Sequence, residues 1–290
     1  MTLLDAIRLG RISNLPTVWT NVLAAIVLAG GGVGDPRFVL LLVALSLAYI
    51  AGMYLNDAFD AEFDRRERPE RPIPSGRVRR GTVIAAGLVM LGLSIALLGW
   101  AGFAIADGTG PWPLLAGTAL AAAIVFYDVH HKANRLSPVL MGFCRALVYV
   151  TAGAAFAADL PLSVIIAAFL LWSYIIGLTY LAKQENLGGL AKLWPLIFLA
   201  APLAYGIRLA SLEPFAWLIL LALTGIVGLA IVLAKRRRPG DIGRAVMLLI
   251  AGISLFDVLM IAGAGQTSLA ALAAAGFLLT LALQRVVPGT

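Results

Sequence analysis

Apolar runs of about twenty residues recur along almost the whole chain, from near residue 15 to near residue 286. A helix that crosses a bilayer needs about 20 mostly apolar residues, because it must cover about 30 Å at about 1.5 Å per residue. In lipid every backbone N–H and C=O must be bonded within the segment, so such runs fold as helices. The pattern therefore predicts an all-α integral membrane protein.

The apolar runs number ten, of which the last is the weakest, so we expect nine or ten transmembrane helices. They cover residues 15–28, 38–59, 83–104, 113–127, 138–157, 162–182, 190–210, 214–233, 243–264 and 268–286. Hydrophobic residues make up 61% of the chain and charged residues 13%, against about half and about a quarter in soluble proteins. The longest polar stretch is too short to fold alone, so we expect one membrane domain over residues 1–290.

Loops rich in Lys and Arg alternate with loops that are poor in them. The basic loops carry Arg8, Arg11, Arg65, Arg66, Arg68, Arg71, Arg77, Arg79, Arg80, Lys132, Arg135, Lys183, Lys192 and residues 235–238. The opposite loops carry Arg37 and Arg208. Because positive loops stay in the cytoplasm, we expect a cytoplasmic N-terminus in a multi-pass protein of a prokaryotic inner (plasma) membrane. The net charge of +7 belongs to these loops, which favours the lipid bilayer over nucleic acid as a partner.

The second apolar run ends in a dense group of carboxylates within residues 56–64. In a continued helix Asn56, Asp60 and Asp64 are spaced four residues apart and share one broad face with Asp57. Carboxylates placed there repel one another at the membrane edge unless cations neutralise them. Mg²⁺ prefers oxygen ligands and binds one or two carboxylates together with substrate phosphates. The motif predicts Mg²⁺ bound by these four residues, and the alternative is a solvated loop balanced by its own arginines.

The residues that follow, Arg71-Pro72-Ile73-Pro74-Ser75-Gly76, favour the metal site over the solvated loop. Together with residues 56–64 they resemble the first signature of the UbiA superfamily of intramembrane prenyltransferases, an NDxxDxxxD motif followed by an RPxPSG-like turn. An opening segment at residues 11–19, about nine helices, and a loop with Tyr127 and Lys132 extend the resemblance over most of the chain. It implies a helical bundle around a central cavity that opens to the cytoplasmic side. It also implies Mg²⁺-dependent transfer of a polyprenyl group from its diphosphate to an acceptor.

In this family a second acidic motif, often DxxxD, follows the sixth helix, where this chain has Glu185 as its acidic residue. The resemblance implies catalytic roles for Asp60, Asp64, Lys132 and Glu185, with Glu185 also a metal ligand. We expect substrate binding by Asn21, Asn56, Arg71, Tyr127, Asn134, Arg145, Tyr180 and Lys183. Several of these have a plainer interpretation: a loop lysine that sets topology, an asparagine that joins two helices, an arginine in a structural ion pair. We interpret His130 and His131 as loop residues, and Asp257 as lying outside the site.

The acceptor is the least readable part of the reaction. This scaffold allows aromatic carboxylates, quinone precursors, tetrapyrroles, glycerol-phosphate lipids and polyol-like alcohols as acceptors, and the poorer second acidic motif argues against 4-hydroxybenzoate. We expect a small cyclic acceptor, aromatic or polyol-like. The alternative function is a non-catalytic membrane carrier of polyprenyl lipids, which would also need basic loops and intramembrane charges. A carrier has no need of Mg²⁺-binding carboxylates beside arginines, so the motif favours the enzyme.

Overall fold

The computed structural model describes residues 1–132, 134–183 and 194–287, and within them all regular structure is helical. The elements are α1 (Leu3–Leu9), η1 (Ile12–Asn14), α2 (Pro16–Leu28), α3 (Pro36–Glu67), α4 (Arg80–Phe103), α5 (Trp112–His130), α6 (Ser137–Ala154), α7 (Leu162–Lys183), η3 (Trp194–Leu199), α8 (Ala200–Leu212), α9 (Phe215–Arg236), α10 (Asp241–Gly263) and α11 (Thr267–Gln284). Among the described residues, eight helices are long and apolar enough to cross a membrane. Two shorter apolar segments, Ile12–Leu28 and Leu196–Leu212, bring the count to ten. The predicted all-α bundle of nine or ten spans is confirmed.

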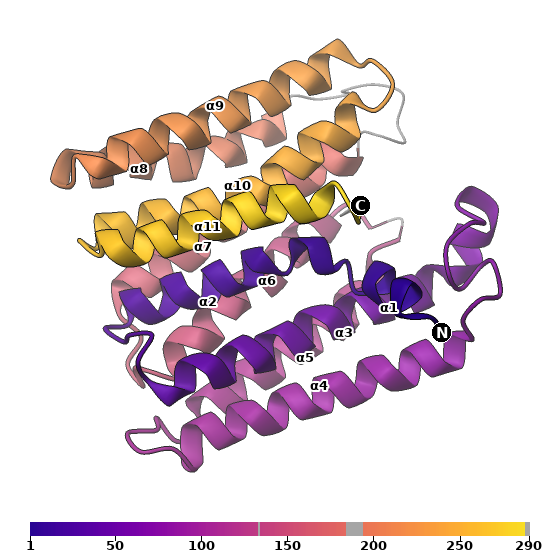
Figure 1. Ribbon diagram of the computed structural model, residues 1–290, viewed down its shortest axis with the longest axis horizontal. Coiled ribbons are helices and arrows are strands. Elements are labelled where there is room, and N and C mark those ends of the chain that lie inside the picture. The colour runs from indigo at the N-terminus through magenta and orange to yellow at the C-terminus, as the bar shows by residue number, and fades with distance from the viewer. Residues whose placement is uncertain (133, 184–193, 288–290) are drawn as a thin grey trace.

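The helices lie side by side in a bundle, with α4 along one edge and α8 and α9 along the other (Figure 1). The centre is occupied by α10, which contacts α2, α7, α8, α9 and α11. Every residue of α10 from 251 to 262 is buried. A helix that is apolar on all sides is stable only where other helices surround it, so α10 forms a core for these five helices.

The two ends of the bundle differ in composition. The start of α1, the end of α11 and the connection between α3 and α4 lie at the same end (Figure 1). This end carries the basic loops, and exposed aromatic rings gather at the other: Trp100, Phe103, Trp112, Phe215 and Trp217. The amphipathic rings of Trp concentrate at membrane–water interfaces, which agrees with the apolar helices in showing an integral multi-pass membrane protein.

Helix α3 is longer than a bilayer requires. Its 32 residues extend over about 48 Å at the usual helical rise, whereas the hydrocarbon core measures about 30 Å. The predicted span, residues 38–59, ended too early, because the helix continues through the acidic motif to Glu67. Good helix formers and the pair between Glu62 and Arg65, at 2.6 Å, support these last turns. The carboxylates are therefore held on a rigid helix that projects from the bilayer.

The two ends of the bundle predict opposite accessibility to a membrane-impermeant thiol reagent. In a background in which Cys144, the single cysteine, is replaced by Ser, we expect Ser75→Cys to react from the cytoplasmic side and Ala106→Cys from the other side. Both positions are exposed and lie in loops at opposite ends. Labelling of both from the same side would contradict the fold, and the reverse labelling would invert the orientation.

Candidate functional site

A cavity of about 410 Å³ lies among α3, α5, α6, α7 and α10. Its inner walls are apolar, with Leu45, Ile124 and Val148 on three of these helices. At its polar end the lining includes Arg11, Arg68, Arg71, Asp128, His131 and Lys183. An apolar chamber that ends in charged groups fits a ligand with a long hydrocarbon chain and an anionic head.

The inward face of the projecting part of α3 carries all four residues of the acidic motif. Asn56, Asp57, Asp60 and Asp64 are buried, each 8% exposed or less. Phe59 and Phe63, to one side of this face, are 37% and 47% exposed. This end of α3 therefore has its carboxylates covered by other parts of the protein, with two aromatic rings beside them that are partly exposed. Such a face is stable only if the covering segments supply positive charge or hydrogen-bond donors.

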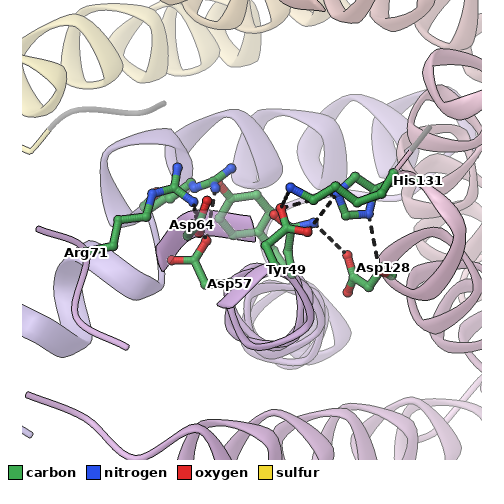
Figure 2. A network of polar contacts seen from close by, with 10 residues as sticks. Tyr49, Asp57, Asp64, Arg71, Asp128 and His131 are labelled. Carbon is green, nitrogen blue, oxygen red and sulfur yellow. Dashed lines mark hydrogen bonds and ion pairs between the residues drawn. The ribbon is translucent and has the colours of Figure 1, made fainter. Parts of the chain in front are cut away.

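Two arginines from distant segments neutralise the outer carboxylates. Arg71 Nη1 lies 2.7 Å from Asp64 Oδ2 and 3.4 Å from Asp57 Oδ1, and Figure 2 shows its guanidinium turned toward both carboxylates. Arg11 Nη2 reaches Asp57 Oδ1 at 3.2 Å from the other side. The turn after α3 and the segment before α2 thus close over the motif.

Asp60 is held by the residues that follow α5. His131 Nε2 lies 3.2 Å from one carboxylate oxygen and Lys132 Nζ lies 3.1 Å from the other. The Lys132 ammonium also lies 3.5 Å from the centre of the Phe63 ring, a favourable cation–π contact. Burial lowers the pKa of His131, but the Asp60 carboxylate outweighs burial and raises that pKa above its usual value.

The fourth residue of the motif contacts a carboxylate from α5. Asn56 Nδ2 donates to Asp128 Oδ1 at 3.1 Å. Asp128 is only 4% exposed, and its second oxygen, Oδ2, is buried without a hydrogen-bond partner. A buried acceptor without a donor is rare and costly, so this oxygen is available to a ligand or a cation.

The structure brings together most of the predicted site residues. Arg71 and Tyr127 line the polar end of the cavity, where Tyr127 stacks on His131 with ring centres 5.0 Å apart. The four motif residues lie next to this end, and their carboxylates pair with Arg71, His131 and Lys132. Lys183 also lines this end and donates to the Asn134 carbonyl at 2.9 Å. Glu185 lies outside the described residues.

Three other predicted residues lie away from the cavity lining. The Asn134 side chain accepts a hydrogen bond from the Leu136 backbone N–H, just before α6 begins. Tyr180 lies partly buried in the last turn of α7. Asn21 donates to Asp257 Oδ2 at 2.8 Å, deep inside the bundle, so the structure gives it the interhelical contact that is its plainer interpretation.

Asp257 is the centre of a separate buried network. It is fully buried, and Thr20 donates to its Oδ2 at 2.6 Å while Tyr149 donates to its Oδ1. The network links α2, α6 and α10 within the membrane. Our interpretation that Asp257 lies outside the site agrees with its position away from the cavity lining, although it is a core residue.

Sequence reasoning did not assign roles to Arg11, Asp128 and His131. Arg11 looked like a topology signal and His131 like a loop residue, because their contacts come only from tertiary packing. Asp128 did carry a signal, since a carboxylate at the end of an apolar run is costly unless it has a function or a partner.

The profile of the UbiA prenyltransferase family matches residues 17–249. The chain belongs to this family. The matched range includes the acidic motif, the turn after it and the end of α5, so the family similarity covers the site as well as the bundle.

Several curated relatives share the name digeranylgeranylglyceryl phosphate synthase. The chain is 39% identical over 75 residues to the one from Pyrococcus horikoshii, covering 25% of this chain and 27% of that protein. It is 32% identical over 120 residues to the one from Methanoregula boonei, covering 40% and 39%. With the one from Methanospirillum hungatei the identity is 25% over 244 residues, 82% of this chain and 79% of the relative. The first two matches thus span well under half of each relative's length.

Two solved structures have the same fold. One, from work on digeranylgeranylglyceryl phosphate synthase in membranes, has a TM-score of 0.62 at 16% identity and covers 90% of this chain and 98% of its own. The other, an apo UbiA homologue from Aeropyrum pernix, has a TM-score of 0.62 at 17% identity, with 87% and 96% covered. At these identities the likeness is evidence for the fold alone.

The donor set suits Mg²⁺. In the part of the chain that the structure describes, no three His, Cys, Asp or Glu side chains converge to hold a metal by themselves. Mg²⁺ does not need such a cluster, since it binds one or two carboxylates and completes its shell with phosphate oxygens and water. The orphaned Asp128 Oδ2 and the row of carboxylates on α3 are hard oxygen donors of the required kind.

The Asp257 network predicts a stability effect that is independent of the cavity. Tyr149→Phe leaves Asp257 Oδ1 without its donor inside the membrane, so we expect a loss of about 1 to 2 kcal/mol. Thermal unfolding in detergent measures it, with Thr118→Val as the control because exposed Thr118 bonds within its own helix. Equal melting temperatures for Tyr149→Phe and the parent would contradict a structural role for the network.

Proposed function

We propose that this protein is a Mg²⁺-dependent membrane prenyltransferase that moves a polyprenyl group from an allylic diphosphate to an acceptor hydroxyl. The observation that supports it most strongly is the arrangement at the end of α3. There, carboxylates and basic side chains meet at the polar end of an apolar cavity. Family membership supports the same reaction class.

The reaction begins with breakage of the allylic C–O bond. The electron pair leaves with the diphosphate, and the allylic carbon becomes electron-poor. The acceptor oxygen forms a new C–O bond to that carbon, and its hydroxyl proton is released. The protein must stabilise the charge that develops on the diphosphate and keep water away from the allylic carbon.

The basic side chains at the polar end would bind the diphosphate. In this structure Arg11, Arg71 and Lys132 hold carboxylates of the motif. Arg offers a planar fork that suits phosphate oxygens, and Lys binds them as a point charge. The apolar walls, with Leu120, Ile124 and Ile175 among them, would hold the prenyl chain and exclude water.

Asn56, Asp57, Asp60 and Asp64 would hold Mg²⁺, with Asp128 beside Asn56. When bound there, the metal supplies Lewis-acid charge that stabilises the departing diphosphate. The carboxylates would bind the metal in place of Arg11, Arg71 and Lys132, and these side chains would then be free to bind phosphate oxygens. Glu185 keeps its proposed role as a further ligand, and it lies outside the described residues.

For the acceptor, the relatives favour a glyceryl phosphate lipid over the cyclic acceptor expected from the sequence. The supporting fact is the shared name of the relatives, which describes the synthesis of a prenylated glyceryl phosphate. The reaction would occur at the cytoplasmic face of a prokaryotic inner membrane, with the N-terminus in the cytoplasm. The support for this orientation is that the basic loops lie at the end of the bundle that holds the site.

Removing a carboxylate of the motif should abolish turnover without unfolding the protein. We expect Asp60→Asn and Asp64→Asn to lower the rate by at least about 100-fold at saturating Mg²⁺, because each removes a charge from the proposed metal site. The matched control is Glu62→Gln on the same helix, since Glu62 is exposed and pairs with Arg65. Melting temperatures of all three variants check the folding.

Turnover of Asp60→Asn and Asp64→Asn at the parent rate would show that these residues do not bind the metal. If the parent protein binds a polyprenyl diphosphate and never cleaves it with any acceptor, the carrier function replaces the enzyme.

The acceptor class is tested with purified protein, Mg²⁺ and geranylgeranyl diphosphate. We expect mass spectrometry to detect prenylated product with a glyceryl phosphate acceptor, and little or none with aromatic acids or cyclic polyols. Product from a cyclic acceptor alone would restore the expectation drawn from the sequence.

A further inference from the structure

Arg145 lines the cavity from α6, about two turns into the helix. Its Nη2 donates to Thr17 Oγ1, and its guanidinium carbon lies 5.8 Å from the centre of the Tyr49 ring. Its Nη1 is buried without a hydrogen-bond partner. One side of this cation is therefore held in place by the protein, and its charge is left without a matching anion.

The nearby carboxylates are committed elsewhere. Asp257 already accepts from Thr20 and Asn21 on one oxygen and from Tyr149 on the other. Asp57 pairs with arginines outside the membrane. Across the described ranges, Arg145 forms no ion pair. A charge retained inside a membrane protein without a counter-ion indicates a functional site whose partner arrives from outside.

Arg145 lies deeper in the bundle than the acidic motif. Its neighbour Tyr49 precedes Asp57 by eight residues on α3, which corresponds to about 12 Å along the helix axis. A diphosphate, in which one oxygen joins the two phosphorus atoms, is shorter than this separation. This depth favours an anion other than the diphosphate of the donor as the partner of Arg145.

We infer that Arg145, positioned by Thr17 and Tyr49, forms a second anion-binding subsite that takes the charged group of the acceptor. The inference rests on the proposed function and narrows it to acceptors that carry an oxyanion, a phosphate monoester or a carboxylate. The guanidinium fork suits both groups. Neutral acceptors of the same shape leave the buried charge unpaired and are rejected.

Steady-state kinetics of Arg145→Gln test the subsite. We expect the KM for the acceptor to rise about tenfold or more, and the KM for the diphosphate donor to stay within about twofold. The melting temperature should not fall, because the variant removes an unpaired buried charge. Arg145→Lys should recover part of the acceptor affinity, because it keeps the charge and loses the fork.

The matched control is Arg37→Gln at the opposite end of the bundle. Arg37 is buried and bonded to Asp35 and to the carbonyls of Asp107 and Ala155. This variant should lower the melting temperature and leave both KM values unchanged. An equal rise of both KM values in Arg145→Gln would assign Arg145 to the diphosphate, and a lowered melting temperature with unchanged KM values would make it structural.

A binding measurement separates this inference from the proposed function. The measurement compares glycerol phosphate with glycerol, and 4-hydroxybenzoate with phenol, by their effect on the melting temperature of the purified parent protein. At least one anion should stabilise the parent more than its neutral analogue, lose this advantage in Arg145→Gln and keep part of it in Arg145→Lys. The anion that gives the larger rise in melting temperature over its neutral analogue indicates whether the subsite prefers a phosphate or a carboxylate.

If neither anion exceeds its neutral analogue, or the advantage survives in Arg145→Gln, the subsite is wrong. If the Arg145-dependent shift is present while no acceptor is ever prenylated, the subsite stands and the proposed reaction fails.

Discussion

Three carboxylates on the inward face of a helix that leaves the membrane cannot stay buried without compensating positive charge. Asp57, Asp60 and Asp64 are each nearly inaccessible, and their mutual repulsion in this setting is strong. Cations from three segments supply this charge: Arg11 before α2, Arg71 in the turn after α3, and Lys132 just after α5. These segments come from different parts of the described chain, so the electrostatics of one helix end determine how they close over it.

Inside the bundle, polar groups fall into two kinds. The Asp257 carboxyl has donors for both oxygens and joins three helices, so its chemistry is satisfied by the fold. Arg145 and Asp128 each keep one buried polar atom without a partner, and both residues line the cavity. Satisfied polar groups stabilise a membrane bundle, whereas unsatisfied ones indicate where a ligand completes the structure.

Much of this arrangement could be predicted from the sequence, because lipid leaves few alternatives. Repeated apolar runs and alternating basic loops predicted the helices, and the spacing of Asn56, Asp60 and Asp64 predicted one face of α3. The partners of that face could not be predicted from the sequence, because Arg11 and His131 meet the carboxylates only through the packing of α1, α3 and α5. Asn21 was expected at the substrate and instead bonds Asp257, since a polar residue in a helix pattern does not reveal which neighbour it faces.

The functional expectation depended on the combination of carboxylates with a following arginine-rich turn, and the structure explains why the two occur together. The turn returns Arg71 to Asp57 and Asp64, so the motif and the turn form one charged unit. Carboxylates already paired with cations can exchange those partners for a metal, and the cations can then hold the anion that accompanies it. A purely structural cluster has no need for an adjoining apolar cavity.

The most direct test is the Mg²⁺ dependence of binding for a non-cleavable thiodiphosphate analogue of the prenyl donor, measured by titration calorimetry. The proposed site predicts that affinity in the parent and in Glu62→Gln rises strongly with Mg²⁺, and that Asp60→Asn combined with Asp64→Asn removes this dependence. Binding of the analogue by the parent with the same affinity in Mg²⁺ and in chelator would contradict the proposed site.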